Sequence, residues 1–117
     1  MLELRKTTPH QTVSLEACGG SVMLSLDDGK GHAFRQALDA HDAGEVLCVV
    51  YNAICACVTV CQGDLVVRVK DYGKLLLSWR ENGDLAYVIL ESSDKLVFKA
   101  ALESYCRMLM RPKGDEP

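Results

Sequence analysis

The chain has no excess of basic residues and no apolar segment long enough to cross a membrane. Its 117 residues include 13 Lys+Arg and 16 Asp+Glu, which gives a formal net charge of -3. Proteins that bind duplex nucleic acid normally carry a clustered basic surface. The longest apolar stretch, residues 46–61, is interrupted by Asn52 and Thr59 and is shorter than a membrane span. We therefore expect neither duplex nucleic acid nor a membrane among its partners.

We also expect no secretion signal and find no nucleotide-binding motif. The first residues, MLELRKTT, contain no apolar run of the length found in signal peptides, so we expect a cytoplasmic protein. The polar loop Asp27–His32 combines carboxylates, glycines, a lysine and a histidine, but it lacks the P-loop spacing. We interpret it as the capped start of a helix and predict no cofactor.

Cysteine, in contrast, is frequent. In a reducing cytoplasm, cysteines are mostly small buried packing residues. The pattern Cys55-x-Cys57-x3-Cys61 would place three thiols on one side of a strand, but structural zinc sites usually take their ligands from tight turns. A zinc protein stays a third hypothesis, and we predict no metal ligand. The six cysteines are Cys18, Cys48, Cys55, Cys57, Cys61 and Cys106.

Size and composition predict one folded domain. The hydrophobic fraction is 49% and the charged fraction 25%, both ordinary for a globular protein. A chain of this length buries a sizeable core without disulfide bonds or metals. We expect a single α+β domain over residues 1–111 and a disordered tail over residues 112–117.

Residues 58–90 predict an antiparallel β-meander. Gly63, Gly73 and Gly83 are evenly spaced, and each supplies the positive φ that a tight hairpin turn requires. A two-residue first turn and three-residue second and third turns place the large apolar residues on one face. The facing pairs predicted in this way are Val58 with Val67, Val60 with Leu65, Leu65 with Trp79, Val67 with Leu77, Val69 with Leu75, Trp79 with Leu85, Leu77 with Tyr87, and Leu75 with Ile89.

The remaining elements follow from hydrophobic periodicity. Two alternating runs joined by Gly19-Gly20 predict an N-terminal hairpin, with a short strand before it at Leu2 and Leu4. Residues 32–43 have helical spacing, with Gly44 as the C-cap. Residues 46–51 favour a strand, with a break near Asn52 and a second strand from Ile54, although a buried helix fits residues 45–57 equally in periodicity. A long apolar stripe from Val97 to Leu109 predicts a C-terminal helix that covers the sheet.

The fold expected from these patterns is α+β, with an antiparallel sheet of about five to seven strands. A short helix follows the N-terminal hairpin, and a long C-terminal helix packs on the sheet. The face of the meander opposite the core is too apolar for a simply solvated surface. Either the helix predicted over residues 32–43 covers it or a protein partner does, and we expect a homodimer. The residues of this predicted interaction surface are Val66, Arg68, Leu76, Arg80, Val88 and Leu90.

Two functions from different classes fit the sequence. The preferred hypothesis is a small non-enzymatic protein-binding or regulatory protein, of adaptor, immunity or inhibitor type, that acts through the sheet face. The alternative is a small-molecule-binding protein or small enzyme whose pocket lies between the sheet and the C-terminal helix, lined by Trp79, Tyr87 and Tyr105. We predict no catalytic residue.

Overall fold

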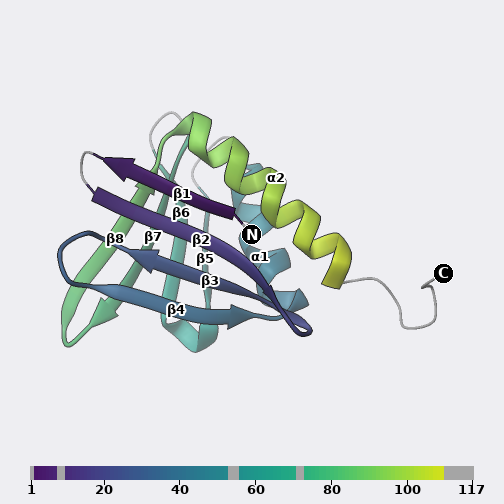
Figure 1. Cartoon of the computed structure of the whole chain (residues 1–117), viewed down its shortest axis with the longest axis horizontal. Helices are drawn as coiled ribbons and strands as arrows, with labels where there is room; N and C mark the ends of the chain where they lie inside the picture. Colours follow the sequence, from purple (N-terminus) through teal and green to yellow (C-terminus); the bar gives the residue numbers. More distant parts are fainter. Residues whose placement is uncertain (1, 8–9, 53–55, 71–72, 110–117) are drawn as a thin grey trace.

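The chain runs twice through the same order of elements, four antiparallel strands followed by a helix (Figure 1). In this computed structural model, the described residues are 2–7, 10–52, 56–70 and 73–109, with side chains described from Gln11 onward. The first half comprises β1 (Leu2–Thr7), β2 (His10–Cys18), β3 (Ser21–Asp27), β4 (Ala33–Leu38) and α1 (Ala40–Tyr51). The second comprises β5 (Cys57–Val60), the 3-10 turn η1 (Cys61–Gly63), β6 (Leu65–Lys70), β7 (Lys74–Glu81), β8 (Asp84–Leu90) and α2 (Ser92–Leu109).

The expected α+β class, its antiparallel pairing and the C-terminal helix are confirmed. The strands form two sheets of four, β1-β2-β3-β4 and β5-β6-β7-β8, instead of one sheet of five to seven. Figure 1 shows the first sheet in front of the second, with α1 and α2 along one side of the pair. Helix α2 contacts strands of both sheets and also packs on α1. The inner faces of the sheets and the facing sides of the helices form one buried core, which includes Leu15, Leu24, Leu77, Phe98 and Leu102.

The predicted hairpin is confirmed as β2 and β3, which pair Leu15 with Leu24 and turn at Gly19-Gly20. The short strand at Leu2 and Leu4 is confirmed as β1. The expected disordered tail, residues 112–117, and the strand start at Ile54 lie outside the described residues.

The short helix expected after the N-terminal hairpin is confirmed as α1, but its predicted bounds, 32–43, are wrong. Residues 33–38 form β4, which pairs with β3 and places Phe34 and Leu38 toward the core. The helix begins later, because the Asp39 side chain accepts a hydrogen bond from the N–H of Asp42 at 2.8 Å and caps α1. Gly44, expected to end a helix, lies inside α1.

The preferred prediction of a strand over 46–51 is also wrong. These residues belong to helix α1, the alternative that hydrophobic periodicity allowed equally. Val46, Val49 and Val50 lie on one buried face of α1, at the spacing of one helical turn. The expected break near Asn52 is confirmed, since Asn52 is the C-cap of α1. A high content of β-branched residues favours a strand only weakly. The burial of a whole helical face against the core outweighs that preference.

The meander over 58–90 is confirmed, and so is the register of its first two turns. Val60 pairs with Leu65, and Leu65 in turn pairs with Trp79. The third turn is shorter than expected: Asn82 and Gly83 form a two-residue turn, with φ of 52° and 85°, that pairs Glu81 with Asp84. This shift of one position reverses the faces of β8, because side chains alternate along a strand.

Candidate functional site

The candidate site is the side of the second sheet that faces away from the core, which we call the outer face. It is built from alternate residues of three adjacent strands, and the pairing of these strands brings the residues together. The outer face consists of Val66, Arg68 and Lys70 of β6, Leu76, Ser78 and Arg80 of β7, and Leu85, Tyr87 and Ile89 of β8.

Large apolar side chains are exposed on this face. Leu85 has 59% of its surface accessible and Tyr87 42%, while Val66, Leu76 and Ile89 are half-buried beside them. Ser78 lies at the centre of the outer face. It is buried, and its Oγ donates a hydrogen bond to the Val66 carbonyl at 3.5 Å. A groove of about 440 Å³ runs across the face and is lined by Val66, Arg68, Lys70, Leu76, Ser78, Leu85, Tyr87 and Ile89.

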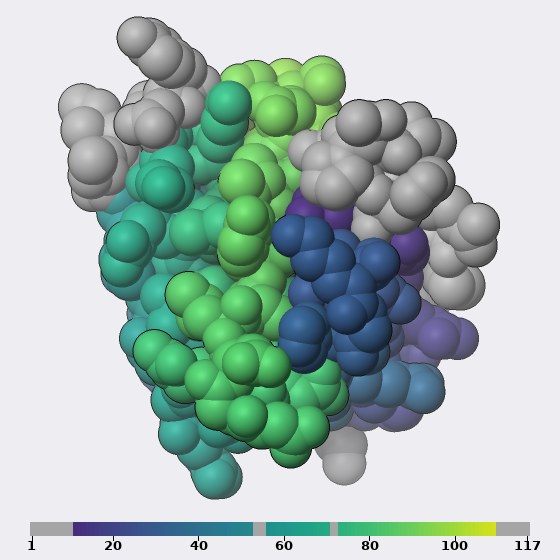
Figure 2. All heavy atoms as spheres, turned by 90° about the vertical axis from the view of Figure 1, so that its left-hand side faces the viewer, coloured from purple at the N-terminus to yellow at the C-terminus, as the bar shows by residue number. Residues whose placement is uncertain are grey.

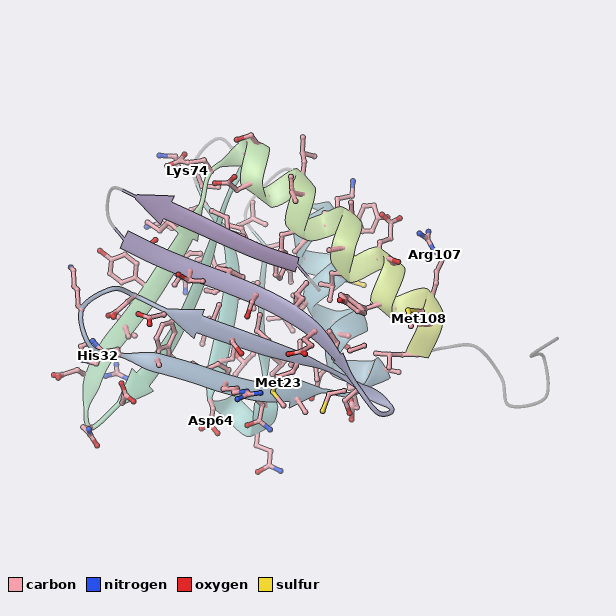
Figure 3. The ribbon with its side chains drawn as sticks, in the orientation of Figure 1. Met23, His32, Asp64, Lys74, Arg107 and Met108 are labelled. Atoms are coloured by element: carbon pink, nitrogen blue, oxygen red, sulfur yellow. The ribbon has the colours of Figure 1, made fainter. Side chains whose placement is uncertain are left out.

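The charges of the outer face have one sign along its strands. Arg68, Lys70 and Arg80 are exposed there, and β6, β7 and β8 carry no carboxylate at an outward position among the described residues. Acids occur at the margins, where Asp64 precedes β6 and Glu91 Oε2 lies 3.7 Å from Lys74 Nζ. Figure 3 shows Lys74 and Asp64 at opposite ends of this sheet. The outer face is therefore an apolar groove between cations.

The first sheet offers a comparison within the same chain. Its outward positions are mainly small or polar, and of its large apolar residues Met23 alone lies there among those whose side chains are described. These positions are Thr12, Ser14, Glu16, Cys18, Ser21, Met23, Ser25, Asp27, Ala33, Arg35 and Ala37. An antiparallel sheet with one solvated face has this composition, whereas the outer face of the second sheet does not.

Four of the six residues predicted for an interaction surface lie together on the outer face: Val66, Arg68, Leu76 and Arg80. The placement of Val88 and Leu90 there is wrong, because the two-residue turn at Asn82-Gly83 directs both into the core, where they have no exposed surface. Leu85, Tyr87 and Ile89 take their place. An Asn-Gly pair between two alternating runs is a strong signal for a two-residue hairpin and could have identified them.

The predicted pocket of Trp79, Tyr87 and Tyr105 is not formed. Trp79 is buried in the core, with its ring 6.0 Å from that of Phe34. Tyr87 lies on the outer face, on the other side of the sheet. Tyr105, on α2, donates its hydroxyl to the Leu15 carbonyl at 3.4 Å. The reversed faces of β8 are the reason that Tyr87 does not meet Trp79.

The cysteine pattern is only partly described. Cys57 is exposed on β5, whereas Cys61 is buried in the turn after the strand, so the two do not line one strand. Burial raises the pKa of the Cys61 thiol to about 11, so it is protonated near neutral pH. Cys55 lies outside the described residues, and within them no three His, Cys, Asp or Glu side chains are grouped as metal ligands.

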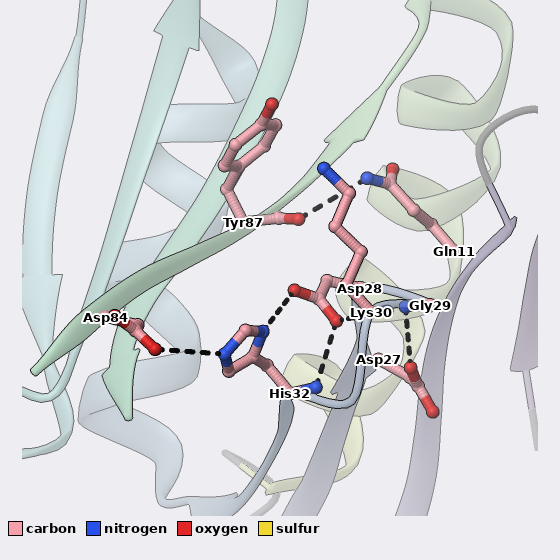
Figure 4. A network of polar contacts seen from close by, with 8 residues as sticks. All are labelled: Gln11, Asp27, Asp28, Gly29, Lys30, His32, Asp84 and Tyr87. Atoms are coloured by element: carbon pink, nitrogen blue, oxygen red, sulfur yellow. Dashed lines mark hydrogen bonds and ion pairs between the residues drawn. The ribbon is translucent and has the colours of Figure 1, made fainter. Parts of the chain in front are cut away.

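Figure 2 shows the region of the β3–β4 loop, in blue, against the region of the β7–β8 hairpin, in green. A polar network lies there, beside the outer face (Figure 4). His32 Nδ1 lies 2.8 Å from Asp28 Oδ2, and His32 Nε2 lies 3.7 Å from Asp84 Oδ2. Asp28 Oδ1 also accepts hydrogen bonds from the N–H groups of Lys30 and His32. The loop Asp27–His32 is thus a strand connection, not the start of a helix.

The network shifts the pKa values of Asp28 and His32. The hydrogen bond to Asp28 raises the pKa of His32, and this outweighs its partial loss of hydration. Burial acts to raise the pKa of Asp28, but the hydrogen bonds from Lys30 and His32 hold it below the usual value of 3.8. Each group therefore favours the charged form of the other.

Comparison of the chain with models of protein families, with curated proteins and with solved structures returned no match. Among the described residues, no helix has the length and apolar character to cross a membrane.

Proposed function

We propose that this protein is a non-enzymatic binding module that holds an acidic segment of another protein, anchored by apolar side chains, on the outer face. The observation that carries the proposal is the contrast between the two sheets. One outward surface is polar, whereas the other exposes Leu85 and Tyr87 over a groove bordered by cations.

The apolar residues of the outer face favour a partner that removes them from water. Contact between apolar surfaces yields about 25 cal/mol per Å² buried. A contiguous apolar surface with a polar border is typical of protein interaction sites. The groove has the volume of a few side chains, so a short segment with two or three apolar anchors suits it.

The charges favour an acidic occupant over a second copy of this chain. In a homodimer formed through this face, Arg68, Lys70 and Arg80 of each copy would approach the same cations of the other. Like charges across an interface are costly, whereas opposite charges set register and accelerate association. The homodimer expected from the sequence is therefore the competing occupant in the test below.

The aromatic content of the face favours a polypeptide over single-stranded nucleic acid. Sheet surfaces that bind single strands stack successive bases on two or three aromatic rings. On the outer face, Tyr87 is the aromatic residue among the described side chains, and the groove is otherwise aliphatic.

The cysteines support a reducing compartment, and the two buried thiols are poorly suited to nucleophilic chemistry. All five described cysteines are free thiols, as is usual in the cytoplasm, where we propose the protein acts. Burial raises the pKa of both Cys61 and Cys106. A thiol protonated at neutral pH is a poor nucleophile.

The test is a selection of random 12-residue peptides displayed on phage against the full chain. We expect the selected peptides to combine Asp or Glu with Leu, Ile or Phe. Arg68→Glu and Leu85→Ser should each weaken their binding, measured by fluorescence polarisation, by about tenfold, which corresponds to 1.4 kcal/mol. Added salt should also weaken binding, because the cations are exposed.

Matched controls separate the outer face from the rest of the surface. Arg35→Glu changes an exposed arginine on the first sheet, and Leu96→Ser changes a leucine on α2 that is 60% exposed. Both should bind the selected peptides as the unchanged chain does. Failure to select any peptide, equal loss in the controls, preferential binding of single-stranded RNA, or a dimer that Leu85→Ser disrupts in sedimentation would each contradict the proposal.

A further inference from the structure

We propose that the hollow beside the outer face, at the free edge of β8, binds the side-chain carboxylate of one Asp or Glu in the partner segment. This inference rests on the proposed function and specifies which chemical group the partner presents. The hollow has a volume of about 80 Å³ and is lined by Gln11, Asp28, Lys30, His32, Leu85, Ala86 and Tyr87.

The backbone of β8 offers hydrogen-bonding groups at this edge. In an antiparallel pair, residues alternate between those that bond the neighbouring strand and those whose groups point away. The two-residue turn makes Glu81 and Asp84 the first bonded pair, so Ala86 and Val88 also bond β7. The N–H and C=O groups of Leu85 and Tyr87 therefore point toward the edge.

Gln11 shows how a side chain engages this edge. Its Nε2 donates to the Tyr87 carbonyl at 3.4 Å (Figure 4). Its Oε1 accepts from the Ile89 N–H at 3.2 Å. The adjacent pair along the edge, the Tyr87 N–H and the Leu85 carbonyl, has no hydrogen bond within the part of the chain that the structure describes. A second side chain can therefore use the edge beside Gln11.

The side chains around the hollow favour an anion. Lys30 forms no ion pair with a described carboxylate, and its side chain extends toward Tyr87 and Gln11 in Figure 4. His32 uses Nδ1 for Asp28, which leaves Nε2 with the long contact to Asp84. A carboxylate could accept hydrogen bonds from the Tyr87 N–H, from Lys30 and from His32, since charge-assisted bonds are the stronger ones.

The acidic residues around the hollow do not prevent a partner carboxylate from binding there. Both oxygens of Asp28 are occupied, one by two backbone N–H groups and the other by His32. Asp84 is 74% exposed, so it can move aside when a partner carboxylate binds. Glu81 lies in the electrostatic surroundings of His32 and, with Asp84, reduces the positive charge that an anion meets.

The size of the hollow matches a small group. Its volume of about 80 Å³ leaves room for a carboxylate and its methylene group. Because the hollow and the groove share Leu85 and Tyr87, one short segment can occupy both.

The experiment uses one selected peptide and a set of variants of the full chain. In the peptide, replacing the Asp that enters the hollow by Asn, or the corresponding Glu by Gln, should weaken binding at least fivefold. Lys30→Gln and His32→Gln should each weaken binding of the acidic peptide by a similar factor and leave binding of the amide peptide unchanged. Asp84→Asn should strengthen binding of the acidic peptide, because it removes the competing carboxylate.

Two further readouts report on the hollow directly. The Tyr87 amide proton should move downfield in the NMR spectrum when the acidic peptide binds, as it gains a charged acceptor. Binding should weaken as pH rises and His32 loses its proton, and His32→Gln should remove that dependence.

The outcomes separate this inference from the proposed function. If the peptide binds and Arg68→Glu weakens it, but the Asp-to-Asn exchange and Lys30→Gln have no effect, the groove is a binding site and the carboxylate site is wrong. If both acidic and amide peptides bind equally and both shift the Tyr87 amide, the hollow accepts an amide, and the inference is likewise overturned. If no peptide binds, the proposed function itself fails.

Discussion

Gln11 is a buried polar residue that joins the two sheets. It is 5% exposed, and its amide forms the two bonds to the β8 edge. Gln11→Ala removes both and leaves the backbone groups of Tyr87 and Ile89 with fewer partners. We expect a loss of about 1–3 kcal/mol in the free energy of unfolding, the usual cost of unpaired buried polar groups. Urea denaturation followed by circular dichroism measures it.

The control for this change is Gln36→Ala, at an exposed position of the edge strand β4. It removes a glutamine of the same size from the same sheet and should change the free energy of unfolding by less than about 0.5 kcal/mol. Equal stability of the two variants would show that Gln11 does not join the sheets.

His32 should make stability depend on pH near neutrality. Because its pKa is raised above the usual 6.5 by Asp28, its contribution to stability is full below 6.5. The contribution is lost as pH rises through the higher pKa of the folded state. The urea midpoint of the unchanged chain should therefore decrease between about pH 6 and pH 8.5.

His32→Gln should flatten this dependence, whereas His41→Gln should preserve it, since His41 is exposed on α1. A midpoint that rises over the same interval, or an equal slope in the two variants, would contradict the assignment of the shift to the Asp28–His32 pair.

At the scale of elements, the β7–β8 turn decides which side of β8 is exposed. Gly83 has a φ of 85°, a conformation that costs residues with a side chain about 1–2 kcal/mol. Gly83→Ala should lower the free energy of unfolding by about that amount, whereas Gly20→Ala, with no positive φ and open space around it, should change it little. Thermal unfolding compares the two variants, and an equal effect would contradict the role of the turn.

This turn also explains why hydrophobic alternation alone did not predict the site correctly. The residues of β6 and β7 were assigned to the correct face because their turns and alternating apolar residues agreed. In β8 both faces carry large apolar residues, so alternation could not distinguish Leu85, Tyr87 and Ile89 from Ala86, Val88 and Leu90. The register of β8 therefore depended only on the length of the β7–β8 turn. An error of one residue in that length reversed the predicted faces of the strand.

The errors in the first half have a related cause. Residues 33–38 form an edge strand that buries few side chains, so the local pattern was weak and pairing with β3 decided the structure. Residues 46–50 are rich in valine, yet they lie on α1 because the helix buries three valines against the core. The hollow could not be predicted at all, since it unites Gln11, Lys30 and Tyr87 from distant parts of the chain.

At the scale of the molecule, the two sheets have the same strand order and different outward surfaces. The first is polar, as expected for a surface in water, and the second combines a groove of about 440 Å³ with exposed cations. The net charge of the chain is -3, so the cations of the outer face are a local feature and not a consequence of composition. This asymmetry is the basis for proposing one binding surface.

The most direct measurement is NMR mapping of the full chain with a selected acidic peptide. We expect the largest amide shifts in β6, β7 and β8 and in the loop around Lys30 and His32. The outward residues of β2 and β3, such as Ser14 and Ser25, should not shift. Shifts concentrated on the first sheet or on the exposed side of α2, with β6 to β8 unchanged, would contradict the assignment of the outer face as the binding surface.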